Sequence, residues 1–351
     1  MTESRTEISK LGEFGLIDRL AARVSQSNPS TVRGIGDDAA VVDSGDHYAL
    51  ISTDMLLEGI HFDLRYVPLR HLGYKAVAVN VSDIAAMNGS PAQVVVGLGL
   101  SNPFSVEALE ELYSGMQAAC ADYGVDLVGG DTSASAAGLV LSVTIMGTVG
   151  KNQIAYRSGA QVNDIICVTG DLGAAFVGLQ VLEREKAVFL ANPHAQPDLE
   201  TYSYVVGRQL KPAARMDIIH DLREAGVVPS SMIDVSDGLA SELIHLSRHS
   251  GLGIRIYEDK VPIDHRTYDA ALEFKLDPIV CALNGGEDYE LLFTVRQTDL
   301  DKIKNHPDVH LIGHMHGQSG QNTMVSKAGT VVPVTAQGWN HFNSSETQSA
   351  G

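Results

Sequence analysis

The chain has 351 residues, a length that corresponds to two domains or to one large domain. Its 25 Lys and Arg residues against 43 Asp and Glu residues give a formal net charge of -18, which disfavours binding to nucleic acids and to anionic membrane surfaces. With 44% hydrophobic and 19% charged residues, the composition is that of a folded globular protein and not of a disordered chain.

The hydropathy of the chain predicts neither a transmembrane helix nor a secretory signal. Residues 94–100 form one of the longest apolar runs, but Gly interrupts it and it falls far short of the roughly 20 residues that a spanning helix needs. The first thirty residues lack the basic start and apolar middle of a secretory signal. We therefore expect a cytoplasmic protein that does not bind membranes.

The three cysteines, Cys120, Cys167 and Cys281, are far apart and form no Cys-x-x-Cys pair. This spacing disfavours a disulfide framework and a thiolate zinc site. We expect three reduced and buried thiols.

The first half of the chain alternates helix and strand patterns. Apolar residues at helical spacing predict a helix over 12–26, and short strands at 39–42 and 48–52 predict a hairpin that places Thr53 and Asp54 at a strand end. The further predicted elements are a helix at 69–87, a strand at 93–100, a helix at 105–123, a short strand at 126–128 before the turn-like Gly129, Gly130 and Asp131, and a strand at 139–149.

A second set of elements starts near residue 150. It comprises a strand at 165–169, helices at 174–184 and 212–225, a strand at 232–234 and a helix at 239–249. The sequence therefore predicts an α+β protein with α/β-type layers and two domains, residues 1–149 and 150–342. We expect the polar segment 343–351 to be a disordered tail.

Acidic residues recur where an apolar strand ends or a Gly-rich turn begins. Each one alone is typical of a turn or a helix N-cap. If several converge in one cleft, however, they repel each other unless cations are present, which points to Mg²⁺ and, with it, to a phosphate substrate. The clusters are Asp37 with Asp38, Asp54, Asp83, Asp131, Asp234 with Asp237, and Glu287 with Asp288.

The familiar nucleotide-binding motifs are absent from the sequence. The single Gly-Lys pair, Gly150-Lys151, is followed by Asn152, which excludes a P-loop, and the protein-kinase signatures are missing as well. Histidines at 306, 310, 314 and 316 could suggest a metal site, but Pro307 and Gly313 interrupt any helix that would align them, so a strand with surface residues is favoured. Phosphoryl chemistry therefore requires another fold.

A series of motifs resembles the thiamine-monophosphate kinase family, which belongs to the aminoimidazole ribonucleotide synthetase-like superfamily. The motifs extend from residue 34 to residue 342. They are Gly34-Ile35-Gly36-Asp37-Asp38, Ser52-Thr53-Asp54 with Glu58-Gly59-Ile60-His61-Phe62, Asn80-Val81-Ser82-Asp83, Gly129-Gly130-Asp131-Thr132, Asp234-Val235-Ser236-Asp237-Gly238, Gly285-Gly286-Glu287-Asp288-Tyr289-Glu290, and Gly338-Trp339-Asn340-His341-Phe342.

The resemblance implies a two-domain fold of that superfamily and a homodimer that pairs through the N-terminal sheets. It also implies the activity: Mg²⁺-dependent transfer of the ATP γ-phosphoryl group to thiamine monophosphate, which yields thiamine diphosphate and ADP. An anionic acceptor must approach an anionic γ-phosphate in this reaction, and bound cations reduce their repulsion.

The resemblance also assigns roles to individual residues. The implied Mg²⁺ ligands are Asp37, Ser52, Thr53, Asp54, Asp83, Asp131, Asp234 and Asp237; the ATP contacts are Tyr113, Gly130, Asp131, Arg157 and Ser236; and the acceptor contacts are His61, Glu287 and Trp339. Asp83, Asp131 and Arg157 are the residues expected to be catalytic.

Two alternatives stay open at this point. Another ATP-dependent superfamily member, such as aminoimidazole ribonucleotide synthetase, shares several of the acidic motifs. A non-enzymatic acidic protein that binds divalent cations is the alternative from another class, although the sequence lacks the EF-hand pattern and that role would leave Arg157 and Trp339 without a purpose.

Overall fold

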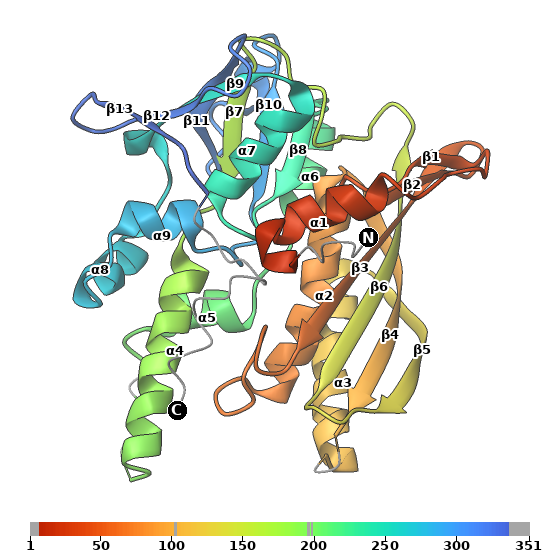
Figure 1. The fold of residues 1–351 in the computed structure, drawn as a ribbon, viewed down its shortest axis with the longest axis vertical. Coiled ribbons are helices and arrows are strands. Elements are labelled where there is room, and N and C mark those ends of the chain that lie inside the picture. The colour runs from red at the N-terminus through yellow and green to blue at the C-terminus, as the bar shows by residue number, and fades with distance from the viewer. Residues whose placement is uncertain (1–6, 102–103, 195–196, 198, 337–351) are drawn as a thin grey trace, which may run out of the picture.

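Two β-sheets organise the computed structural model of the chain, which describes residues 7–101, 104–194, 197 and 199–336 (Figure 1). The first sheet has the strand order β1-β2-β3-β6-β4-β5, and its neighbouring strands are antiparallel except for the parallel pair β4 and β5. Its strands are β1 (Thr31–Arg33), β2 (Ala40–Asp43), β3 (His47–Leu57), β4 (Ser90–Leu100), β5 (Asp126–Ala134) and β6 (Val140–Gly150).

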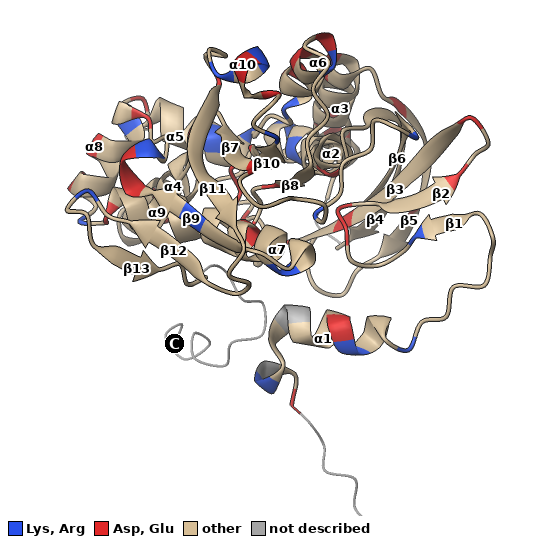
Figure 2. Cartoon of the chain, turned by 90° about the horizontal axis from the view of Figure 1, so that it is seen from above, with Lys and Arg blue, Asp and Glu red and all other residues tan. Residues whose placement is uncertain are grey.

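Helices α2 (Leu69–Ala86) and α3 (Val106–Tyr123) cover one face of the first sheet (Figure 1). α3 begins after Ser105, whose hydroxyl oxygen accepts the backbone N–H of Ala108 at 3.3 Å, and it ends at Gly124, where φ is +65°. The 3₁₀ turn η1 (Ile8–Lys10) and helix α1 (Gly12–Ala21) precede the sheet, and α1 lies beside α7 (Leu239–Ser250) of the second half (Figure 2).

The second sheet has the order β13-β12-β9-β11-β7-β10-β8, with β12 and β9 parallel and the other neighbours antiparallel. Its strands are β7 (Ile165–Thr169), β8 (Ser231–Asp234), β9 (Gly253–Tyr257), β10 (Leu291–Val295), β11 (Val309–His316), β12 (Asn322–Val325) and β13 (Val331–Pro333). The accompanying helices are α4 (Ala174–Ala191), α5 (Ser203–Leu210), α6 (Met216–Glu224), α7, η2 (Glu258–Lys260), α8 (His265–Glu273), α9 (Pro278–Asn284) and α10 (Leu300–Ile303).

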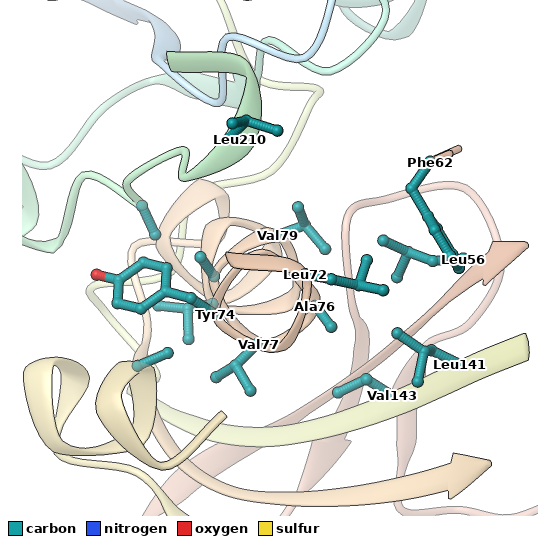
Figure 3. Close-up of a cluster of buried hydrophobic side chains, with 14 of the residues drawn as sticks. Leu56, Phe62, Leu72, Tyr74, Ala76, Val77, Val79, Leu141, Val143 and Leu210 are labelled. Carbon is teal, nitrogen blue, oxygen red and sulfur yellow. The ribbon is translucent and has the colours of Figure 1, made fainter. Parts of the chain in front are cut away.

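α2 is buried along nearly its whole length, because it packs against the first sheet on one side and against the second half of the chain on the other. Figure 3 shows side chains of α2 directed toward Leu56 and Leu141 of the first sheet, with Leu210 of α5 on another side of the helix. A helix that is apolar on most of its surface is stable only when it is covered in this way. The two halves therefore share one hydrophobic core around α2.

Two glycines allow α2 and α3 to approach each other closely. A Cβ atom added to Gly73 of α2 would lie 2.0 Å from the carbonyl oxygen of Leu112, and one added to Gly115 of α3 would lie 1.9 Å from the carbonyl oxygen of Arg70. Both obstacles are backbone atoms, which cannot move without separating the helices. Glycine is therefore required at this crossing.

We expect Gly115→Ala to lower the free energy of unfolding by about 1–3 kcal/mol or more, because the added methyl group forces α2 and α3 apart. Urea denaturation of the purified variant measures the change. Gly207→Ala in α5 is the matched control, since no atom lies within 4 Å of its added Cβ and alanine favours helix by about 0.5–1 kcal/mol. Equal stability of Gly115→Ala and the unmodified protein would contradict the argument.

Two strands are longer than the sequence predicts. β3 continues to Leu57, because the chain keeps alternating inward and outward side chains and pairs with β6 throughout. Asp54 consequently lies inside a strand and not at its end. Gly130 and Asp131, which the sequence predicts in a turn, pair with β4 as part of β5.

Other predicted elements match in kind but differ in length. α1 ends at Ala21, before the predicted end at 26, whereas α4 continues to Ala191, beyond the predicted end at 184. The sequence does not predict α5. The histidines of 309–316 lie on a strand as expected, and all three cysteines are buried and free. Among the described helices, none is both long and apolar enough to cross a membrane.

The predicted boundary near residue 150 falls between the last strand of the first sheet and the first strand of the second. The division into domains 1–149 and 150–342 stays a prediction, since the core around α2 is continuous across it. The predicted tail, 343–351, lies outside the described residues.

Candidate active site

Three carboxylates meet where the two halves of the chain come together. Asp38 precedes β2, Asp83 lies in the last turn of α2, and Asp234 ends β8; one oxygen of each lies within 4.8 Å of the others. These three residues form the acidic group. The structure thus brings together two of the metal ligands that the resemblance implies, and it adds Asp38.

Serine hydroxyls from the first half hold two members of the acidic group. Ser52 Oγ of β3 donates to Asp83 Oδ2 at 2.5 Å, and Ser82 Oγ of α2 donates to Asp234 Oδ2 at 2.6 Å. The strand that carries Ser52 also carries Asp54, whose backbone N–H donates to Asn80 Oδ1 of α2 at 3.2 Å. These bonds fix β3, α2 and β8 relative to one another at the site.

Burial and mutual repulsion make three carboxylates at this site, those of Asp54, Asp83 and Asp234, hard to ionise. Burial raises the pKa of Asp234 to about 7 and that of Asp54 to about 6, and in both cases the carboxylate of Asp38 adds to the rise. Burial, followed by repulsion from Asp54, also raises the pKa of Asp83 well above its usual range. A cation among these oxygens would favour their charged forms.

Arg157, in the segment between β6 and β7, joins the two aspartates of the first acidic motif. Its guanidinium donates to both oxygens of Asp38, from Nη2 at 2.7 Å and from Nε at 3.3 Å, and its backbone N–H donates to Asp37 Oδ1 at 2.7 Å. Asp37 also pairs with Arg33. Of the two, only Asp38 has a carboxylate oxygen within 4.8 Å of those of Asp83 and Asp234, and the role of Asp37 as a metal ligand stays a prediction.

The loop after β8 carries Ser236 and Asp237 beside the acidic group. Glu242 in the first turn of α7 is 2% exposed, and its Oε1 accepts the backbone N–H of Asp237 at 2.9 Å. Sequence analysis overlooked Glu242. The signal was present, because an acid in the first turn of a helix can reach back to the N–H groups before it.

The two predicted acceptor contacts that lie among the described residues, His61 and Glu287, are in turns that join the sheets to their helices. His61 follows β3, where its Nδ1 accepts the backbone N–H of Leu57 at 3.1 Å. Glu287 follows α9 and has a left-handed backbone, with φ at +58°, as has Tyr289 at +53°. Such strained non-glycine residues gather at functional sites.

Three predicted residues lie away from the acidic group. Thr53 alternates with Ser52 and faces the other side of β3, where its hydroxyl donates to the carbonyl of Val143 at 3.1 Å. Gly130 and Asp131 lie on the exposed edge strand β5, three strands from β3 in the sheet order β3-β6-β4-β5. Strands are roughly 4.8 Å apart, so about 14 Å separates β3 from β5 within one chain.

The remaining two predicted contacts add little to the described site. Tyr113 lies on α3, where it packs against the core around α2. Trp339 lies outside the described residues.

The comparisons with known proteins agree with this architecture. Residues 36–149 match the family described as AIR synthase related protein, N-terminal domain. The thiamine-monophosphate kinase of Bacillus subtilis strain 168 is 34% identical over 340 residues, which cover 95% of this chain and 100% of that protein. The thiamine-monophosphate kinase of Escherichia coli strain K12 is 35% identical over 341 residues, covering 94% and 98%.

A solved structure, AaThiL complexed with AMPPCP and TMP, superposes on the fold with a TM-score of 0.81 at 31% identity, covering 97% of this chain and 100% of that chain. Residues 36–149 thus match the N-terminal domain of the AIR synthase-related class, and the whole two-sheet fold is that of the AaThiL structure. Within that class, the chain belongs to the thiamine-monophosphate kinase family and is an enzyme of the kinase type. The resemblance that the sequence motifs suggest is confirmed.

We expect the raised pKa values to make the metal-free protein less stable as the pH rises. The folded protein holds protons on Asp54 and Asp234 more tightly than the unfolded chain does, so their contribution to the free energy of unfolding is fully present below about pH 4 and falls as the pH rises to about 7. Melting temperatures of the unmodified protein and of Asp234→Asn, measured without metal across this range, should show a weaker decline in the variant.

The matched control is Asp301→Asn, since a hydrogen bond from Lys304 lowers the pKa of this exposed residue. This variant should decline with pH as the unmodified protein does. The interpretation of the acidic group fails if Asp234→Asn also does so.

Proposed function

We propose that the protein transfers the γ-phosphoryl group of ATP to the phosphate of thiamine monophosphate, by direct in-line transfer that depends on Mg²⁺, as the last step of thiamine diphosphate biosynthesis. The observation that carries this proposal is the acidic group of Asp38, Asp83 and Asp234 beside the Arg157 guanidinium. The ligands of the related AaThiL structure, AMPPCP and TMP, support the choice of donor and acceptor.

The donor set at the site fits Mg²⁺. Mg²⁺ prefers oxygen ligands and is held in proteins by carboxylates together with substrate phosphates. Burial, followed by repulsion from neighbouring carboxylates, raises the pKa of Asp83 and Asp234 of the acidic group, and Asp54 and Ser52 lie beside them. The proposed Mg²⁺ ligands are Asp38, Asp83 and Asp234 of the acidic group, the adjacent Ser52 and Asp54, and also Asp37, Thr53, Asp131 and Asp237. When bound, Mg²⁺ would neutralise charge on the phosphates.

Arg157 has the geometry to grip a phosphate. Its guanidinium already binds the Asp38 carboxylate through two nitrogens, and phosphate oxygens accept the same paired bonds. We assign Tyr113, Gly130 and Ser236 to the nucleotide as well. The acceptor phosphate is largely ionised at neutral pH, so no general base is required. Catalysis then consists of positioning and charge neutralisation, with His61, Glu287 and Trp339 holding the acceptor.

The direct test is formation of thiamine diphosphate by the purified protein with ATP, Mg²⁺ and thiamine monophosphate. We expect product from the monophosphate, none from free thiamine and none without metal. Product from free thiamine would indicate a pyrophosphokinase instead. If ATP binds with Mg²⁺ but the monophosphate gives no product, the acceptor assignment is wrong and the substrate of aminoimidazole ribonucleotide synthetase is the next to test.

A homodimer through the first sheet would explain the position of Asp131. The face of this sheet away from α2 exposes five apolar side chains, a larger patch than isolated surface residues form. They are Ile51 and Met55 of β3, Val95 of β4, Val128 of β5 and Met146 of β6. Thr53 and Asp131 lie on the same face. We propose that two copies pair here, and that the partner subunit's Asp131 completes a site that one chain leaves incomplete.

We expect Asp83→Asn and Asp131→Asn each to abolish turnover, and a co-expressed mixture to recover about a quarter of the unmodified activity, because half of the dimers are mixed and one of their two sites is intact. Steady-state assays of the mixture measure the recovery. Asp83→Asn mixed with Asp234→Asn is the control. It should stay inactive, because each subunit of a mixed dimer then carries one change in its own acidic group and neither site is intact. A first mixture as inactive as its components would refute a shared site.

A further inference from the structure

Lys75 is a buried lysine in the middle of α2, and its side chain is 4% exposed. Lysine is rarely buried unless its charge is paired. Its Nζ donates to Glu287 Oε2 at 2.8 Å and to the backbone carbonyl of Gln209 at 3.3 Å. The ammonium group therefore joins α2 to the end of α5 and to the loop after α9.

Gln209 supplies a second donor to the same carboxylate oxygen. Its Nε2 donates to Glu287 Oε2 at 2.7 Å. In the described part of the chain, both side-chain donors to Glu287 reach Oε2, and neither reaches Oε1. The Glu287 side chain is 29% exposed, so the carboxylate is held at one oxygen while remaining accessible to a ligand.

The backbone of Glu287 is fixed from the other side. Its N–H donates to the carbonyl of Ser236 at 2.7 Å, next to Asp237. Gly286 before it has φ at +72°, and a Cβ there would lie 2.6 Å from the same carbonyl oxygen. Glu287 itself holds a left-handed backbone, a conformation that persists only where the surroundings enforce it. Contacts from both halves of the chain thus determine where this carboxylate lies.

We propose that Lys75 and Gln209 are positioning residues, which fix the Glu287 carboxylate through Oε2. Oε1 is then free to accept a hydrogen bond from the acceptor substrate or to attract its positive charge. The inference rests on the proposed function, in which Glu287 contacts the acceptor. Thiamine monophosphate carries an amino group and a thiazolium cation, and a fixed carboxylate attracts both. A mobile carboxylate would lose conformational freedom on binding and would bind the acceptor less tightly.

The test compares how a variant changes the KM for thiamine monophosphate and the KM for ATP. Lys75→Met keeps the length of the side chain but removes the donor to Glu287, so we expect the KM for thiamine monophosphate to rise about tenfold or more while the KM for ATP is unchanged. Lys302→Met is the matched control, because Lys302 also bonds a carboxylate and a backbone carbonyl, but on α10. It should leave both KM values unchanged.

A double-mutant cycle distinguishes positioning from a separate structural role. If Lys75 acts through Glu287, then Lys75→Met should add nothing to the rise in acceptor KM caused by Glu287→Gln. Additive effects, or equal changes in both KM values, would overturn the inference. If Lys75→Met does not fold, Gln209→Met decides: it removes one donor to the same oxygen and should raise only the acceptor KM.

The inference and the proposed function fail in different ways. If the unmodified protein makes no thiamine diphosphate, the proposed function is rejected and the inference with it. If the unmodified protein is active but Lys75→Met retains its acceptor KM, only the positioning role of Lys75 is rejected.

Discussion

Burial of α2 between the two sheets is the constraint on which the rest of the site depends. Because the helix is covered on all sides, its polar residues can contact both halves of the chain at once: Ser82 bonds Asp234 of the second sheet, Asp83 bonds Ser52 of the first, and Lys75 bonds Glu287. The glycines at the crossing with α3 allow the two helices to pack closely against each other. α2 therefore both packs in the core and positions the polar residues of the site.

The acidic group works against the stability that this packing provides. Its carboxylates are buried near one another, and Arg157 compensates only part of their charge through its contact with Asp38. The fold holds them in place through hydroxyl donors and the shared core. Functional sites typically have such an arrangement, in which the protein is less stable but binds its ligand more strongly. The affinity of these carboxylates for a cation therefore depends on the packing that buries them and holds them close together.

The sequence predicts the kind and order of most helices and strands and part of the candidate site. Individual residues show why the remaining site residues could not be predicted. Acidic motifs at element ends predicted that Asp83 and Asp234 would matter, since strand and helix ends gather at sites. Sequence could not decide between Asp37 and Asp38, because adjacent residues differ only in the direction of their side chains. Lys75 lies within an apolar helix, so its role shows only once its burial and its partners are known. Glu242, by contrast, could have been found from its place in the first turn of a helix. Asp131 lies on the exposed edge strand β5, away from the acidic group, and this position follows from the strand order of the sheet, which the local sequence pattern does not contain.

The acidic group also spans the two halves of the molecule, with Asp38 and Asp83 from the first and Asp234 from the second. A cation held there would act as a cross-link between the sheets, whereas its departure would leave like charges pushing the same elements apart. The rigidity of the molecule would then follow the occupancy of its site.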